Sequence, residues 1–546
     1  MLYQVIILAI ATTPRKKSGK FWLLTIKVMT ESRRHVSRYK PLLFSTTMRS
    51  PERIKHFLTV LQEYDGLVLT ESLTKKVASE LIKRRLYSPS KLSANMRRKI
   101  KDGYLLSDND VEKIIKANPQ SHKESGFPAG WPSRFDTWYK IAKELGFVFY
   151  NFEEKIVFSA IGNHLVNNPA LEQGAFLNAM IKYQRNNPFR RVLNDNVPLV
   201  LLLQVISLIN ASNKYNGFGI SRKELLFLLF WKNNDAGELF RKIEALRKKH
   251  KYNPSDEVVY EICRNEILPE DRVKRDVRSI MRDYPDDFVR KMRMSGLISL
   301  RGRGRFIDIN KNELHRVKYV LQKYGNYEKY DSEREYFEHV SQIDEGLFSI
   351  APNIPSKNQR MDLFNARVKE YDWKTIKHEL LILGRKTHSQ DDVFKIIPAP
   401  LRLEYLTALA VKKQFPSVDV VPNYGMDDEG MPVSHAPGRG NTGDIECSEG
   451  KNGILIEVTL IDTAQQITVE LFAISDHLDK FSSNYKGNVI CYFVAPSIHA
   501  RSHKALPYFK YEFKQTISGK SIEEFVKYIE ESTKLYDAAI VRQERA

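Results

Sequence analysis

HAPGRGNTGDIECSEGKNGILIEVTLIDTAQQITVELFAISDH, residues 435–477, joins a loop rich in Gly, Pro and Asn to two strand-like runs and then to a helix. Asp444 stands at the start of the first strand-like run, and Glu457 ends the apolar run GILIEVTL. Alternate residues of a strand share a face, so Glu457 lies on the same side as Leu455 and Thr459. The pattern predicts one carboxylate on each of two adjacent strands.

The second half of this stretch is predicted to be helical and carries three further polar side chains. Gln466, Glu470 and His477 are spaced by four and seven residues, which places them on one helical face. Two carboxylates on adjacent strands with a third on the packed helix make an oxygen-rich pocket suited to Mg²⁺. In a basic chain, such a pocket favours hydrolysis of a phosphodiester.

A second interpretation is that these acids flank a hairpin and a helix by chance. Single Asp and Glu residues are common on exposed strand ends, where they need no ligand. Glu457, however, lies among Ile454, Leu455, Ile456 and Val458, where an unpaired carboxylate would be costly. This embedding favours the metal site.

Length and charge limit the classes of protein to consider. The chain has 546 residues, enough for about two to four domains with their own cores. Lys and Arg total 86 against 66 Asp and Glu, a formal net charge of +20, while 42% of the residues are hydrophobic. A folded protein with this balance favours a polyanionic partner. The three cysteines, Cys263, Cys447 and Cys491, lack paired spacing, which argues against a disulfide framework or zinc module and fits a reducing cytoplasm.

The N-terminus is MLYQVIILAIATTPRKKSGK, an apolar run followed by positive charge. A secretory signal has the opposite polarity, and the run is too short to cross a bilayer. We therefore expect no membrane segment and a cytoplasmic, prokaryotic protein.

Two tracts share the order helix, glycine, strand, turn, strand, helix. They are WPSRFDTWYKIAKELGFVFYNFEEKIVFSAIGNHLV at 131–166 and DDFVRKMRMSGLISLRGRGRFIDINKNEL at 286–314. This order is how a winged helix ends, so we expect two winged-helix-like units. The alternative is two ordinary α/β connections, because the tracts share pattern and not identity.

The second tract carries candidate DNA contacts. Arg301, Arg303 and Arg305 alternate with glycines at an expected hairpin tip, where the backbone could approach DNA. Arg222 and Lys223 open an expected helix, and a helix N-terminus can meet phosphate. The less specific alternative is a solvated basic turn.

The expected architecture is multidomain α+β: a winged-helix-like DNA-recognition region, a helical linker and a C-terminal α/β restriction-nuclease core. In the core, a helix carrying Glu404 precedes the strands of the acid-rich stretch. The expected boundaries are an N-terminal extension at 1–39, winged-helix-like domains at 40–170 and 171–325, the linker at 326–397, and the endonuclease domain at 398–546.

The elements PVSHAPG…GDIEC…ILIEVTL…QITVE…DH resemble the AlwI family of type IIS restriction endonucleases, members of the PD-(D/E)XK nuclease superfamily. The resemblance is strongest over about residues 398–515 and extends more loosely back to about Lys40. It implies a Mg²⁺-dependent endonuclease that cuts a short distance outside its recognition site. The active-site residues that it implies are Asp444, Glu457, Glu404, Glu470, Gln466, His435 and His477, with Asp444, Glu457 and Glu470 as metal ligands.

This chain departs from the general signature at two positions. Gly443 replaces the proline before the first acid, and Thr459 replaces the signature lysine. Lys451 and Lys480 are the candidates nearby for the role of that lysine, and the sequence does not distinguish them.

Two function classes compete. One is the sequence-specific endonuclease, with double-stranded DNA as substrate, a cognate DNA methyltransferase as genetic partner, and a transient homodimer or small second nuclease subunit for double-strand cleavage. The other is a winged-helix DNA-binding protein with an inactive nuclease-like domain. An RNA-processing nuclease uses similar acids but usually shows base-stacking aromatic surfaces, which the sequence does not reveal. The joint presence of Asp444, Glu457, Glu470 and Gln466 favours the endonuclease.

Overall fold

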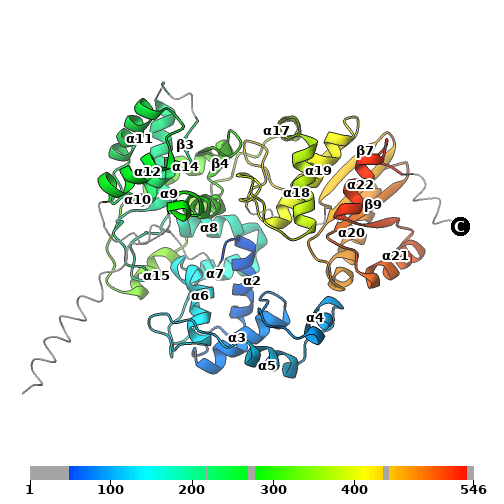
Figure 1. Cartoon of the computed structure of the whole chain (residues 1–546), viewed down its shortest axis with the longest axis horizontal. Coiled ribbons are helices and arrows are strands. Elements are labelled where there is room, and N and C mark those ends of the chain that lie inside the picture. Colours follow the sequence, from blue (N-terminus) through cyan, green and yellow to red (C-terminus); the bar gives the residue numbers. More distant parts are fainter. Residues whose placement is uncertain (1–47, 213, 215–217, 269–276, 435–441, 538–546) are drawn as a thin grey trace, which may run out of the picture.

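The computed structural model describes residues 48–212, 214, 218–268, 277–434 and 442–537. The expected N-terminal extension at 1–39 lies outside these residues, as does His435. Figure 1 shows three regions around a central space: residues 48–168 below, the region of α8–α14 at upper left, and the region of α17–α22 at upper right.

Residues 48–168 are mainly helical, and five of the helices start at a Ser or Thr whose hydroxyl accepts a backbone N–H bond, which satisfies an otherwise unpaired donor. Strands β1 and β2 form a two-stranded antiparallel sheet. Here the expected order of helix, glycine, hairpin and helix is present. The elements are α2 (Pro51–Gln62), α3 (Glu71–Lys83), α4 (Ala94–Lys101), α5 (Asp108–Ala117), α6 (Trp131–Glu144), β1 (Val148–Phe149), β2 (Val157–Phe158) and α7 (Ala160–Asn167).

The next region packs helices around a three-stranded sheet of order β3-β5-β4, in which both pairs are antiparallel. Gly296 (φ +76°) ends the helical segment before β4. The elements are η1 (Pro169–Leu171), α8 (Glu172–Met180), α9 (Pro198–Ala211), β3 (Ile220–Ser221), α10 (Leu225–Phe230), α11 (Ala236–His250), α12 (Asp256–Ile262), η2 (Cys263–Ile267), η3 (Ser279–Asp283), α13 (Tyr284–Met292), η4 (Arg293–Ser295), β4 (Ile298–Arg301), β5 (Phe306–Ile309), η5 (Lys311–Glu313) and α14 (Leu314–Lys323).

Helices fill the sequence between this region and the C-terminal sheet, as the amphipathic pattern predicts. They are α15 (Glu333–Ser341), α16 (Glu345–Phe348), α17 (Lys357–Glu370) and α18 (Trp373–Gly384).

The C-terminal region contains a five-stranded mixed sheet of order β10-β9-β8-β7-β6. Pairs β6/β7 and β7/β8 are antiparallel, whereas β8/β9 and β9/β10 are parallel. The elements are α19 (Ala399–Gln414), β6 (Asp419–Pro422), β7 (Ile445–Glu449), β8 (Asn452–Val458), η6 (Gln466–Leu471), α20 (Phe472–Ser482), β9 (Val489–Ala495), α21 (Ala500–Phe513), β10 (Ile517–Ser521) and α22 (Ile522–Glu531).

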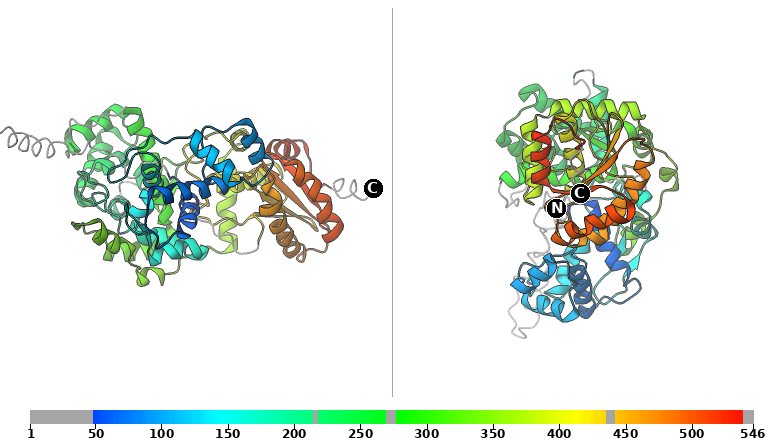
Figure 2. Two further views of the ribbon diagram at one scale, coloured as in Figure 1. Left: turned by 90° about the horizontal axis from the view of Figure 1, so that it is seen from below. Right: turned by 90° about the vertical axis from the view of Figure 1, so that its right-hand side faces the viewer.

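Both faces of this sheet are covered by helices (Figure 2). Ile454 and Ile456 of β8 join the main core, which runs through the whole described chain from Met48 to Leu535. Leu455 of the same strand points into a second cluster, formed with α20 and α21. A strand with apolar residues on both faces must be buried twice, which explains why GILIEVTL lacks alternation.

Three details of the C-terminal and central regions differ from the sequence prediction. Neither strand β10 nor the long helix α21 that precedes it is among the elements predicted from the sequence. Arg222 and Lys223 do not open a helix: they lie between β3 and α10, which begins only at Leu225. Among the described residues, no helix combines the length and apolar character needed to cross a membrane.

Candidate active site

The backbone around Asp444 is fixed by neighbouring strands. The backbone N–H of Asn423, just after β6, donates to the carbonyl of Asp444 (2.9 Å). The backbone N–H of Val458, at the end of β8, donates to the Asp444 carboxylate (2.8 Å). Asp444 is therefore held at the sheet edge by both of its neighbours, next to the strand that carries Glu457.

Glu457 lies near the end of β8 and is 5% exposed. Its Oε1 is 2.9 Å from Nδ1 of His477 on α20. Gly443 contacts the same carboxylate: a Cβ at this position would lie 2.5 Å from Oε1 of Glu457. The glycine that departs from the family signature therefore makes room for this acid.

Glu470 comes from η6, a π-helical segment that precedes α20. The hydroxyl of Thr459 donates to its Oε1 (2.7 Å), so the residue at the lysine position of the signature binds the third acid directly. Lys451 and Lys480 are both exposed. Lys451 precedes β8 at the end opposite Glu457, six residues or roughly 20 Å away along the strand, which is too far to act on it.

Glu404 of α19 completes a cluster of four acids whose pKa values are all raised. Burial raises the pKa of Glu457 to about 8, with a further contribution from Glu470. Burial and then the charge of Glu457 hold the pKa of Asp444 well above its usual range. Burial, Asp444 and Glu52 do the same for Glu404, and burial raises the pKa of Glu470. Burial of several carboxylates in one cluster marks groups that a cation would stabilise.

The oxygen donors of this cluster match a hard divalent cation in chemistry. In the present arrangement, no group of three or more His, Cys, Asp or Glu among the described residues converges closely enough to hold a metal ion. Val458, Thr459 and His477 each contact one of the carboxylates, on Asp444, Glu470 and Glu457 respectively. The oxygen donors have the chemistry that a divalent cation needs, but the side chains, as oriented in this structure, do not converge on one point.

Gln466 is fully buried and connects loops, not acids. Its amide N–H₂ donates to the carbonyls of Ile461 (2.7 Å) and Ser497 (2.8 Å). Its Oε1 accepts from the backbone N–H of His499 (2.9 Å) and the hydroxyl of Ser502 (2.9 Å). Gln466 thus shares a helix with Glu470 and His477, but its amide is fully used in holding the loops on either side.

The residues expected to contact DNA are mostly bound within the protein. Arg301 is 8% exposed and pairs with three carboxylates. Arg222 pairs with Asp286 and donates to the carbonyl of Gly304, and Arg303 donates to the carbonyl of Glu370.

Lys223 donates to the carbonyl of Pro254 (2.6 Å) and pairs with Asp256 (3.2 Å). Arg305 is exposed. Arg301 is buried, unlike Arg305, because two of its three carboxylate partners, Asp428 and Glu429, come from a distant part of the chain. Its expected contact with DNA stays a prediction.

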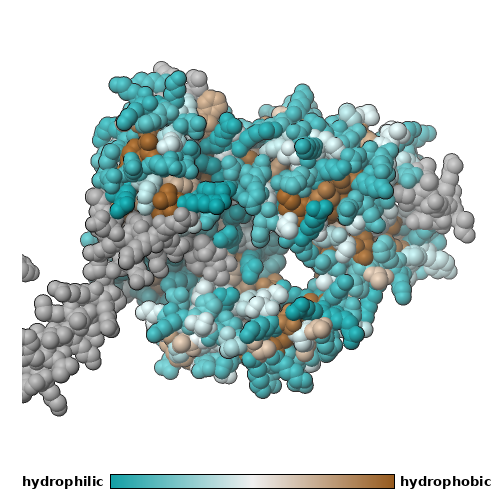
Figure 3. All heavy atoms as spheres, viewed as in Figure 1, coloured by the Kyte–Doolittle hydropathy of each residue, from teal (hydrophilic) through white to brown (hydrophobic). Residues whose placement is uncertain are grey.

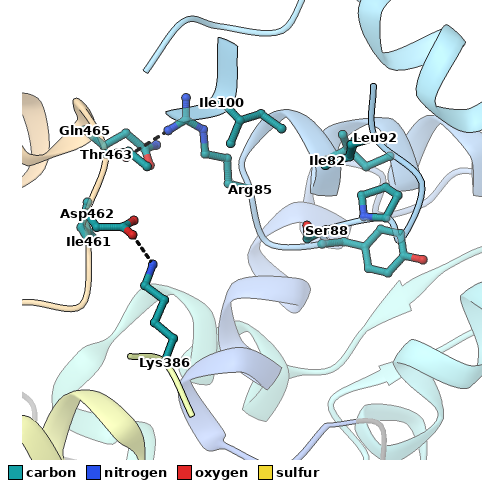
Figure 4. Close-up of a pocket in the computed structure, with 12 residues that line it drawn as sticks. Ile82, Arg85, Ser88, Leu92, Ile100, Lys386, Ile461, Asp462, Thr463 and Gln465 are labelled. Atoms are coloured by element: carbon teal, nitrogen blue, oxygen red, sulfur yellow. Dashed lines mark hydrogen bonds and ion pairs between the residues drawn. The ribbon is translucent and has the colours of Figure 1, made fainter. Parts of the chain in front are cut away.

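Residues 82–104 contact the loop between β8 and η6, which sequence patterns gave no means of predicting. Arg85 donates to the hydroxyl of Thr463 (3.2 Å), and Arg501 lies over the ring of Tyr104 (4.8 Å). Lys386 pairs with Asp462 (2.7 Å) on the same loop, and a cavity of about 280 Å³ lies between these segments (Figure 4). Figure 3 shows a largely hydrophilic face with an opening near the middle of the molecule.

The fold and the site define a multidomain α+β protein whose mixed sheet carries an acid cluster. The model of the AlwI restriction endonuclease family matches residues 143–359 and 357–522, and the chain belongs to this family. Membership assigns it to the restriction endonucleases. No curated protein matches the chain.

Remote likenesses to solved structures are also found. The small subunit R.BspD6I2 of the heterodimeric restriction endonuclease R.BspD6I has 19% identity over 30% of this chain and 84% of its own (TM-score 0.25). The BpuJ1 endonuclease binding domain in complex with modified DNA has 12% identity over 56% and 100% (TM-score 0.36). The restriction endonuclease FokI has 11% identity over 93% and 98% (TM-score 0.24). All three TM-scores are below 0.5, so these likenesses are too remote to assign a fold or an activity.

Proposed function

We propose that the protein is a type IIS restriction endonuclease that hydrolyses DNA phosphodiester bonds a short distance outside its recognition site, with Mg²⁺ as cofactor. The observation that carries the proposal is the cluster of four acids, Asp444, Glu457, Glu470 and Glu404, with raised pKa values at the edge of the mixed sheet. A buried cluster of like charges is costly unless a cation or protons compensate it. Family membership supplies the phosphodiester as the bond to be cut.

Each acid has a role that follows from its position. Bound Mg²⁺ would lower the pKa of an attacking water and stabilise the charge that develops on the phosphate. Asp444, Glu457 and Glu470 are the proposed ligands. His477 orients Glu457 through the Nδ1 contact, and Thr459 orients Glu470 through its hydroxyl. Glu404, on the buried helix α19, adds negative charge to the same pocket.

We also propose that DNA recognition belongs to the region before α15. The β3-β5-β4 sheet with the preceding helices has the strand order of a winged helix, and the β1/β2 hairpin ends a similar unit. The proposed units are 40–170, 171–325, a linker at 326–397 and an endonuclease domain at 398–546. Among the basic residues that the sequence suggests for DNA contact, the exposed Arg305 is the proposed phosphate contact.

Run-off sequencing of plasmid DNA tests this function. Purified protein with Mg²⁺ should yield breaks at a constant offset from one sequence, and EDTA should abolish them. The run-off ends on each strand also tell whether one strand or both are cut, and therefore whether a homodimer or second subunit is needed. A gene for a DNA methyltransferase beside the reading frame is expected.

Specific DNA binding without cleavage in any divalent cation would instead support a winged-helix DNA-binding protein with an inactive nuclease-like domain. The observation that favours this second candidate is Thr459 at the position of the signature lysine.

A further inference from the structure

A buried ion-pair network joins the β4–β5 hairpin to the C-terminal sheet. Arg301 at the end of β4 pairs with Asp308 of its own hairpin (2.7 Å), with Asp428 (2.7 Å) and with Glu429. Asp428 and Glu429 lie in the segment between β6 and β7, 127 and 128 residues further along the chain. Burial lowers the pKa of Arg301, but Asp428 and Asp308 outweigh it, so the guanidinium stays charged. The hairpin is thus bound through full charges and not through a loose surface contact.

The segment that receives Arg301 is a tight turn. The Oδ1 of Asp427 accepts from the backbone N–H groups of Glu429 (3.0 Å) and Met431 (2.9 Å). The backbone N–H of Asp427 donates to the carbonyl of Met431 (2.9 Å). Asp427 is 1% exposed. A turn closed by its own buried carboxylate presents the two following acids in a fixed geometry.

The helix end and strand that flank the hairpin bind the same turn. Arg293 of η4 donates to the carbonyl of Pro432 (2.6 Å) and lies 3.7 Å from Asp427. Asn310, after β5, accepts from the backbone N–H of Asp428 (3.3 Å). We call the set formed by Arg293, Arg301, Asn310 and the turn 427–432 the hairpin junction. Both ends of the hairpin take part, so the turn cannot rotate about a single contact.

The hairpin junction lies close to the first acid of the candidate active site. Asn423 binds the segment before β7 twice: its backbone N–H donates to the carbonyl of Asp444 (2.9 Å) and its side chain donates to the carbonyl of Gly443 (2.7 Å). Only four residues separate Asn423 from Asp427, which is at most about 14 Å of extended chain. Displacement of the turn would therefore move Asp444.

We infer that the hairpin junction fixes the distance between the recognised sequence and the bond that is cut. This inference rests on the proposed function and identifies what sets the cut position. Successive phosphates of one strand advance by only about 3.4 Å along the helix axis, so cutting at one bond requires the acids to be held in a fixed position relative to the recognised sequence. A buried charge network provides such a constraint, because breaking one pair leaves an uncompensated charge and alternative arrangements are disfavoured.

The test combines two substitutions that remove charge but keep shape. Asp428→Asn with Glu429→Gln leaves Arg301 paired with Asp308 alone. The matched control is Glu530→Gln, which removes an exposed pair with Lys377 between α18 and α22, two helices that contribute no residue to the hairpin junction. Run-off sequencing then measures every cut position relative to the recognised sequence, and thermal unfolding establishes that each variant is folded. Glu429→Gln alone serves as the milder variant if the double variant unfolds.

The wild type and Glu530→Gln should cut at one offset. The junction variant should recognise the same sequence, but its cuts should spread over adjacent bonds, because neighbouring bonds are displaced by only about 3.4 Å along the helix axis. No single bond should receive more than about half of the cuts. Unchanged offsets in the folded junction variant, faster cutting at the same offset, or binding without cutting would each overturn the inference while leaving the proposed function in place. A wild type that does not cut would refute the proposed function, and the inference with it.

Discussion

Gly443 and Glu457 are packed so closely that a methyl group on the glycine would overlap the carboxylate. A Cβ at Gly443 would lie 2.5 Å from Oε1 of Glu457 and 2.4 Å from Cδ1 of Leu455, distances that real Cβ atoms do not show. Leu455 is fully buried, so it has little room to yield. The position of Glu457 in the acid cluster therefore depends on the absence of a side chain just before Asp444.

Gly443→Ala should displace Glu457 and lower the rate of DNA cleavage by about a hundredfold, the effect of a misplacement of about 1 Å at a reacting centre. Affinity for the recognised site should stay unchanged. The rate is measured with plasmid DNA and the affinity by gel shift. Gly384→Ala is the control, because a Cβ there meets no atom nearer than 3.5 Å. Normal cleavage by Gly443→Ala would show that Glu457 can move without consequence.

Asp444→Asn and Glu457→Gln should each reduce cleavage at least about a hundredfold, comparable to the loss of one preorganised electrostatic group. Both substitutions preserve shape, so binding of the recognised site should persist. The control is Glu446→Gln, a partly buried acid two residues after Asp444 on β7. An equal loss in the control would mean that any change of charge on this sheet impairs cleavage. The effect would then not be specific to the proposed metal ligands.

Gln466→Ala should lower the free energy of unfolding by at least about 2 kcal/mol, because it removes the four hydrogen bonds of a fully buried amide. Cleavage should fall in parallel with the folded fraction, as expected of a residue that positions loops. Gln465→Ala is the neighbouring control, and its unfolding midpoint should match the wild type. A stable Gln466→Ala variant that has lost cleavage would assign the amide to the reaction instead.

Local pattern was sufficient to predict the acids and the order of elements, because strand alternation and helical spacing place Asp444, Glu457, Glu470 and His477 near one another. It was not sufficient for Arg301 or Gly443. Two of the three carboxylates that bind Arg301 lie more than a hundred residues away, and a basic glycine-rich turn has the same sequence whether or not it meets them. The space at Gly443 is filled by atoms of another strand, which no local pattern encodes.

Asp427 should make stability depend on pH. Burial raises its pKa to about 6 from 3.8, although Arg293 opposes this, and Asp428 adds to it. The folded state therefore holds the proton more tightly than the unfolded chain. The resulting stability is fully present below about pH 3.8 and is lost as the pH rises through about 6. Asp427→Asn should flatten that part of the unfolding free energy curve measured in urea. The two pKa values set the range to compare, about pH 4 to 6. If the slope of the unfolding free energy against pH in this range is the same with and without the substitution, the raised pKa does not belong to Asp427.

Arg301 and Arg305 should separate in their effects although they belong to one turn. Arg305 is exposed, so Arg305→Ala should weaken specific and non-specific binding together and lower the salt slope of binding by about one unit, the effect of one lost phosphate contact. Arg301 is bound by three carboxylates, so Arg301→Ala should leave these acids unpaired and lower the free energy of unfolding by about 3–5 kcal/mol. The salt slope of DNA binding should not change for the protein that remains folded. Titrations of labelled DNA at several salt concentrations, together with urea unfolding, measure both quantities. If Arg301→Ala lowers the salt slope instead, the junction opens on DNA and its arginine moves to a phosphate. If Arg305→Ala changes the preferred sequence, this arginine reads bases directly.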